Sequence, residues 1–137
     1  MVYDNQNIFA RILRGELPAI KVYEDEHVLA FMDIMPQAEG HTLVIPKTPA
    51  VTLLDLPPEA AAYTIQIVQK VAKAIEKALD AKGIVLMQLS GSAAGQTVPH
   101  VHFHLIPSSI HELSKHAASM GDQAAIQALA EKIKAAL

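Results

Sequence analysis

Three histidines stand at two-residue intervals in the segment PHVHFHLIP, residues 99–107. Side chains two positions apart on an extended strand point to the same face. His100, His102 and His104 would therefore present three imidazoles on one face of a strand. The opposite face would be apolar and suited to a core, with the residues Val101, Phe103 and Leu105.

Such a row of imidazoles is compatible with three roles. Plain packing requires partners for two ring nitrogens on each buried histidine. Zinc binding is possible, because histidines two apart on a strand can share an ion, but the nearest carboxylate in sequence, Glu112, lies outside the strand. Nucleophilic catalysis is the third role, because a neutral imidazole attacks phosphorus well and leaves well afterwards.

The residues before the row favour phosphate chemistry. The segment SGSAAGQT, residues 90–97, consists of small residues whose backbone N–H groups can approach a phosphate closely. Gln96 and Thr97 add neutral hydrogen-bond donors. His41 begins another apolar strand, from which its ring could face the same pocket. These features together favour a nucleophilic histidine over a metal site.

Hydrophobic patterning indicates the elements that hold these residues. Five strands are expected, at residues 20–25, 27–34, 41–47, 83–89 and 101–107, the fourth apolar enough to be covered on both faces. Three helices are expected. The first covers residues 8–13, the second runs from Pro58 to about Lys82 with Gly83 at its end, and the third covers about 122–136 with Asp122 as N-cap. The long helix should carry a wide apolar stripe: Ile65, Val68, Ala72, Ile75 and Leu79, widened by Ile67, Val71 and Ala78. The pattern predicts one α+β domain over residues 1–137 with a five-stranded, mainly antiparallel sheet.

Composition narrows the function classes. The chain has 137 residues, 51% of them apolar, and a net charge of −3, which argues against a general nucleic-acid binder. The absence of cysteine excludes disulfides and thiolate metal sites. No apolar run approaches the ~20 residues of a transmembrane helix, and the first 15 residues lack a signal-peptide pattern. We therefore expect a soluble cytoplasmic protein with no membrane partner.

The motif resembles the signature of the histidine-triad (HIT) family, His-φ-His-φ-His-φ-φ with φ apolar, here running from His100 to Ile106. The lead-in AGQTVPHVHFHLIP is similar to that of bacterial HIT proteins. Residues 8–47 resemble the N-terminal half of the Hint-like branch. Together these similarities cover most of residues 7–107.

The resemblance implies a nucleotide hydrolase or transferase. Members attack the α-phosphorus of phosphoramidates, acyl adenylates or dinucleoside polyphosphates and form a nucleotidyl-histidine. By position, His102 would be the nucleophile, His104 would bind phosphoryl oxygens, and His100 and His41 would support them. The remaining positions correspond to family contacts with the nucleotide: Asp33 with the ribose, Ile8, Phe9, Ile12, Phe31 and Ile34 with the base, and Gly95, Gln96 and Thr97 with the phosphate.

The sequence also departs from the family pattern. Asn7 and Ala10 occupy the positions of a Cys-x-x-Cys that helps bind structural zinc in many bacterial members, so no metal and no cofactor are expected. Asparagines are frequent near positions 89 and 90, where this chain has Leu89 and Ser90. Ser90 retains a hydrogen-bond donor for the phosphate. Ser108 replaces a frequent arginine. These changes are also compatible with an alternative function, a nucleotide- or partner-binding protein with little turnover.

The expected partners are a purine nucleoside monophosphate or its conjugates and a second copy of the chain. Homodimerisation is implied by the resemblance. It is consistent with an apolar stripe on the long helix that is wider than one sheet face needs.

Overall fold

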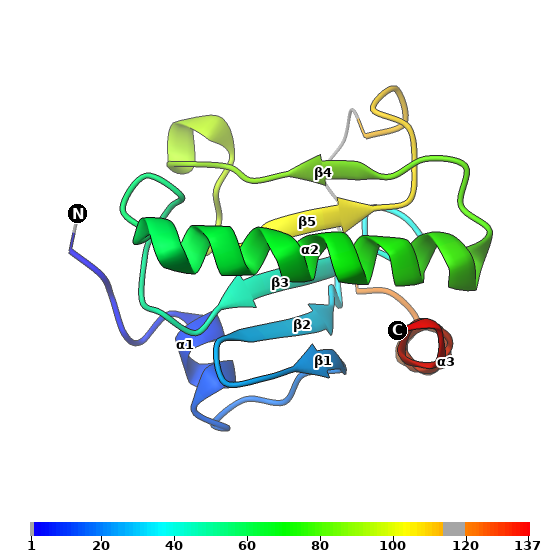
Figure 1. Ribbon diagram of the computed structural model, residues 1–137, viewed down its shortest axis with the longest axis horizontal. Helices are drawn as coiled ribbons and strands as arrows, with labels where there is room; N and C mark the ends of the chain where they lie inside the picture. Colours follow the sequence, from blue (N-terminus) through cyan, green and yellow to red (C-terminus); the bar gives the residue numbers. More distant parts are fainter. Residues whose placement is uncertain (1, 114–119) are drawn as a thin grey trace.

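The computed structural model describes residues 2–113 and 120–137. Its centre is a five-stranded sheet in the order β1-β2-β3-β5-β4, with every neighbouring pair antiparallel (Figure 1). This confirms the α+β class and the antiparallel sheet. The strands, in chain order, are β1 (Lys21–Glu24), β2 (Val28–Met32), β3 (Thr42–Pro46), β4 (Val85–Met87) and β5 (Phe103–Ile106).

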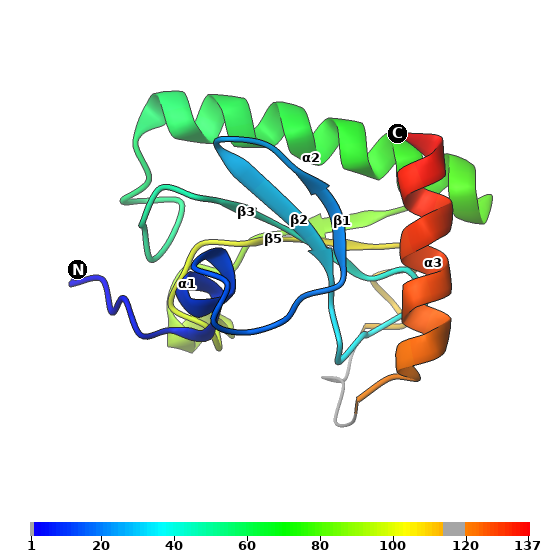
Figure 2. The same ribbon diagram turned by 90° about the horizontal axis from the view of Figure 1, so that it is seen from below.

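Helices cover the sheet on both faces and at one end. The long helix α2 (Pro58–Leu79) lies along one face, and the short helix α1 (Ile8–Leu13) lies on the other (Figure 2). The C-terminal helix α3 (Gln123–Ala136) crosses one end of the sheet and packs against α2 and β1. Asp122 is its N-cap, as expected, since its carboxylate accepts the Ala124 N–H.

The end of the long helix differs from the sequence-based expectation. α2 stops at Leu79, three residues before Lys82, and the left-handed residue that ends it is Asp80, with φ of 49°, rather than Gly83. The buried stripe is also rotated slightly, because Thr64 and Ala74 are buried while Ile65 is 45% exposed. Asp80 accepts the left-handed conformation because aspartate tolerates it better than most side chains.

The last two strands are shorter than expected. β4 has three residues and lies at the edge of the sheet, and its Leu86 is 48% exposed, so the expectation of cover on both faces is wrong. An edge position leaves one side of a strand without a neighbour, which apolarity alone does not reveal. β5 begins only at Phe103, so His100 and His102 precede the strand.

The core consists of two apolar clusters, one on each face of the sheet. The larger lies under α2 and α3 and includes Val101, Phe103 and Leu105. The smaller lies under α1 and consists of Phe9, Leu29, Phe31, Leu43 and Ile45. Among the described residues, no helix is both long enough and apolar enough to cross a membrane.

Candidate active site

The three histidines of the motif lie on the face of the sheet that α1 covers. The alternation persists through the irregular start of β5, because Val101 is fully buried in the α2 cluster while the His102 ring lies 4.9 Å from the Phe9 ring of α1. The His102 and His104 ring centroids are also 4.9 Å apart. The backbone thus brings the imidazoles together as the two-residue spacing predicts.

The hydrogen bond at Nδ1 of His102 determines which of its nitrogens can react. Nδ1 lies 2.7 Å from the His100 carbonyl oxygen. Because a carbonyl only accepts, Nδ1 must carry the proton, and the neutral ring keeps its lone pair on Nε2. His102 is only 6% exposed, so little water competes for that lone pair.

His100 is held in the opposite tautomer. Its Nε2 lies 2.8 Å from the Pro46 carbonyl oxygen and therefore donates. Its Nδ1 consequently accepts, and the donor is the Tyr3 hydroxyl. The His100 ring is fully buried with both nitrogens bonded, so it contributes to the site through its position.

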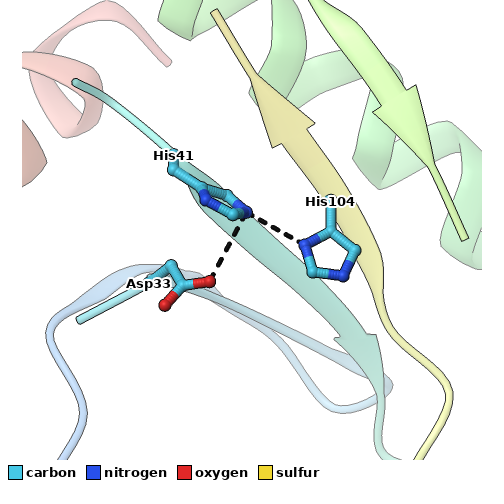
Figure 3. Close-up of side chains that lie close together, drawn as sticks. All are labelled: Asp33, His41 and His104. Atoms are coloured by element: carbon cyan, nitrogen blue, oxygen red, sulfur yellow. Dashed lines mark hydrogen bonds and ion pairs between the residues drawn. The ribbon is translucent and has the colours of Figure 1, made fainter. Parts of the chain in front are cut away.

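A second network joins Asp33, His41 and His104 (Figure 3). The Gln37 N–H donates to Nδ1 of His41 over 3.1 Å, which places the His41 proton on Nε2. Nε2 is 2.9 Å from His104 Nδ1 and 3.4 Å from an Asp33 carboxylate oxygen. His104 Nδ1 therefore accepts, and its Nε2–H is free to donate to an oxyanion.

Burial keeps these histidines neutral. It lowers the pKa of His41 to about 4 and that of His104 to about 3, with the neighbouring His102 adding to both effects. Burial also lowers the pKa of His102, against the opposing influence of the His100 carbonyl. For His41 the Gln37 N–H acts in the same direction, because it occupies the nitrogen that a second proton would need. The site thus offers a neutral nucleophile beside a neutral N–H donor.

Asp33 is the carboxylate of the site, with a side chain 19% exposed. Its Oδ1 accepts the Met35 N–H over 2.8 Å, and Oδ2 is the oxygen nearer His41. Burial raises the pKa of Asp33, opposed by the Met35 bond. One carboxylate oxygen therefore stabilises the local turn while the other remains available for a ligand hydroxyl.

A metal fits neither of two plausible places. Ligand atoms of Asp33, His41 and His104 lie within 4.8 Å of one another. A metal on His41 Nε2 would put the proton on Nδ1, where it would face the Gln37 N–H donor. At the positions of the family's Cys-x-x-Cys, the Asn7 side chain instead caps α1 by accepting the Ala10 N–H over 2.9 Å. A direct hydrogen bond therefore joins the two positions that zinc would connect.

The expected base-contacting residues differ in their surroundings. Phe9 and Phe31 are buried and pack edge to face at 5.4 Å, with Ile12 beside them. Ile8 and Ile34 are 48% and 41% exposed. Phe9 links this wall directly to the histidine row through its contact with His102. The buried pair serves the core as well, whereas the exposed isoleucines remain accessible to a ligand.

The loop before the motif is held together by its own hydrogen bonds. Gly91 and Gly95 adopt φ of 97° and 109°, and the N–H groups of residues 94–96 donate back to Gly91 and Ser92 carbonyls. The Gln96 amide donates to the Val51 and Val98 carbonyls and accepts the Gly91 N–H. The Gln96 side chain therefore stabilises the loop, and fewer N–H groups are free to bind a phosphate than the composition suggested. Thr97 is exposed beside it.

Two contributors to the site could not be found from the sequence. Tyr3 lies 97 residues before its partner His100, and no spacing rule connects them. The Gln37 contribution is a backbone N–H, which every residue except proline carries.

Ser90, expected near the phosphate, donates its hydroxyl to the Gln88 side chain over 3.0 Å.

Comparison with known proteins shows the family to which the chain belongs. The model of the HIT domain matches residues 14–111. The chain belongs to the HIT family. It is 45% identical over 100 residues to the Protein hit of Bacillus subtilis, covering 73% of this chain and 69% of that one. It is 43% identical to the adenosine 5′-monophosphoramidase HNT1 of Saccharomyces cerevisiae, over 73% of this chain and 61% of that protein.

A solved HIT structure shares the whole architecture. The crystal structure of a Hit-like protein from Bartonella henselae matches this chain with a TM-score of 0.92 at 48% identity, over 100% of both chains. The regions outside the HIT domain match, including residues 2–13 and α3, therefore also have counterparts in a solved structure.

Proposed function

We propose that this HIT protein is a nucleotide hydrolase or transferase that works through a covalent nucleotidyl-His102 intermediate. The observation that carries the proposal is the hydrogen bond from His102 Nδ1–H to the His100 carbonyl, which leaves the Nε2 lone pair free on a buried neutral ring. The phosphoramidase activity in the name of the yeast relative supports the same reaction class.

The reaction proceeds in two displacements at the α-phosphorus. The Nε2 lone pair of His102 forms a P–N bond, and the bond from phosphorus to the leaving group breaks with its electron pair, which releases a carboxylate, a phosphate, or an amine that takes a proton from water. His104 Nε2–H donates to a phosphoryl oxygen as negative charge develops. Water then attacks the same phosphorus and releases its proton to the solvent, the P–N bond breaks, and its electron pair returns to Nε2.

The substrate is a purine nucleoside 5′-monophosphate conjugate. Asp33 Oδ2 accepts from the ribose, and the base lies against the apolar wall that Phe9, Ile8 and Ile34 contribute. The protein works without a metal cofactor, because the donor arrangement at His41 disfavours one.

The test is capture of the intermediate. Wild-type protein is mixed with adenosine 5′-phosphoramidate, quenched and analysed by intact mass and peptide mapping for an adenylyl group on His102. His102→Ala should lose activity by a factor on the order of 10⁴ to 10⁶ while keeping its fold. His27→Ala changes an exposed histidine on another part of the surface and serves as the control. A purified His102→Ala protein that kept a tenth of the activity would exclude this role.

A second candidate is a nucleotide-binding protein with little turnover. It is favoured by Leu89 and Ser90 at positions where relatives often have asparagine, and by the commitment of the Ser90 hydroxyl to Gln88. A panel of adenosine phosphoramidate, acyl adenylate and diadenosine polyphosphate separates the two, since a binder would bind AMP and form no adduct with any of them.

A further inference from the structure

We propose that Tyr3 is a positioning residue for the nucleophile, acting through His100. The inference rests on the proposed function, since it concerns the same histidines. Tyr3 lies in the segment before residue 14, where the HIT domain match begins. Its contribution to the site is therefore made by a part of the chain outside the matched domain.

The contact is a specific hydrogen bond. The Tyr3 hydroxyl lies 2.5 Å from His100 Nδ1, and the two rings meet edge to face at 5.6 Å between centroids. The segment is fastened on its other side, where the Asn7 side chain donates to the Asp4 carbonyl over 2.7 Å and Arg14 donates to the Asn5 carbonyl over 2.6 Å. These contacts hold Tyr3 against the histidine.

The direction of the bond determines its effect. His100 Nε2 already donates to the Pro46 carbonyl, so Nδ1 is an acceptor and Tyr3 supplies the donor. A second proton on His100 would set N–H against O–H. The hydroxyl therefore fixes both the tautomer and the neutral state of a ring that is fully buried.

The fixed ring acts on His102 in two ways. It fixes the position of His100, whose carbonyl accepts the His102 Nδ1–H. The direction in which the His102 Nε2 lone pair points is fixed as a result. Because the His100 ring stays neutral, it also adds no second positive charge beside His102 when His102 becomes a phosphoimidazolium. The groups around the His100 ring are Tyr3, Phe9 of α1, Pro46 of β3 and the neighbouring His102, so Tyr3 and His102 are the titratable ones.

Removal of the hydroxyl leaves the buried Nδ1 without a donor from the described residues. A buried unpartnered nitrogen is costly. The phenylalanine ring offers neither a donor nor an acceptor at this place, so a proton taken up on Nδ1 would also lack a partner. His100 keeps its Nε2 bond to Pro46 but loses the hydrogen bond on the other side of its ring, which weakens the support of His102 and leaves the apolar wall in place.

The test variant is Tyr3→Phe, which keeps the ring and removes only the oxygen. Tyr63→Phe is the matched control, because the Tyr63 hydroxyl donates to Asp25 in a different cluster. With adenosine 5′-phosphoramidate, we expect kcat and the single-turnover rate of adduct formation to fall about threefold to tenfold in Tyr3→Phe, the effect of one neutral hydrogen bond. KM should stay unchanged, and Tyr63→Phe should match the wild type in both constants.

NMR of ¹⁵N-histidine-labelled protein provides the readout that a merely structural role would not move. In the wild type, His100 should show a protonated Nε2 and a hydrogen-bonded, unprotonated Nδ1. In Tyr3→Phe the Nδ1 resonance should shift to the position of an unprotonated nitrogen without a hydrogen bond. A wild-type His100 protonated on Nδ1, or a folded Tyr3→Phe protein with unchanged kcat, would overturn the proposal. Failure of the proposed function is seen separately, as activity that survives His102→Ala.

Discussion

Asp33→Asn tests the nucleotide pocket because the structure divides the work of the two carboxylate oxygens. Oδ1 accepts the Met35 N–H, and Oδ2 lies 3.4 Å from His41 Nε2, where the proposed ribose site lies. In asparagine the amide oxygen must serve Met35, which leaves an NH₂ group in the place of Oδ2. That group cannot accept from a ribose hydroxyl and meets the His41 N–H donor to donor.

The expected loss follows from the bond removed. A charge-assisted hydrogen bond contributes about 1.5–3 kcal/mol, so Asp33→Asn should weaken AMP binding about 10-fold to 150-fold. Affinity for 2′,3′-dideoxy-AMP should change little, because this ligand has no ribose hydroxyls to recognise. Both ligands are titrated calorimetrically at about pH 8, well above the usual carboxyl pKa range.

The control for the charge change is Asp80→Asn, because Asp80 is exposed at the left-handed end of α2, a conformation that asparagine also tolerates. It should bind both ligands like the wild type. If Asp33→Asn weakened both ligands equally, or neither, Asp33 would serve only its turn and the ribose would bind elsewhere.

Three further predictions concern metal, pH and assembly. Activity should survive dialysis against EDTA and metal analysis should find no stoichiometric zinc, whereas tightly bound zinc whose removal abolishes activity would reverse this expectation. Because burial lowers the pKa of His41 from 6.5 to about 4, the unfolded chain binds more protons between these values, so stability present above pH 6.5 is lost as pH falls toward 4. This should amount to about 2 kcal/mol between pH 8 and 5, and His41→Gln, measured by urea unfolding at both pH values, should show a correspondingly smaller difference. Half-exposed Leu86 on edge strand β4 and Ile65 on α2 lie on the same side of the sheet, and we expect them in a homodimer interface. Leu86→Glu should then shift the mass in light scattering from dimer to monomer, and an unchanged mass would place the interface elsewhere.

The sequence alone determined the features that depend on local periodicity. Alternation at residues 100–105 separates histidines from core residues whatever the partner strands are, because successive side chains of an extended chain point to opposite faces. The five strands, the N-cap at Asp122 and the α+β class followed from the same local rules. The end of α2 at Asp80 did not, since a helix can end at any residue that tolerates a left-handed conformation and a glycine three residues later is no better signal.

The tertiary structure decided the proton positions that give the histidines separate tasks. Three chemically identical rings differ in their proton positions because the partners of His100, His102 and His104 are the Tyr3 hydroxyl, the His100 carbonyl and the His41 N–H. These positions fit the support, the nucleophile and the donor of the proposed reaction. Two of those partners are 97 and 63 residues away in sequence, and only the closing of the sheet brings them within bonding distance. A histidine's tautomer is set by what its second nitrogen touches, so composition and spacing could supply the rings while the folded chain assigned their protons.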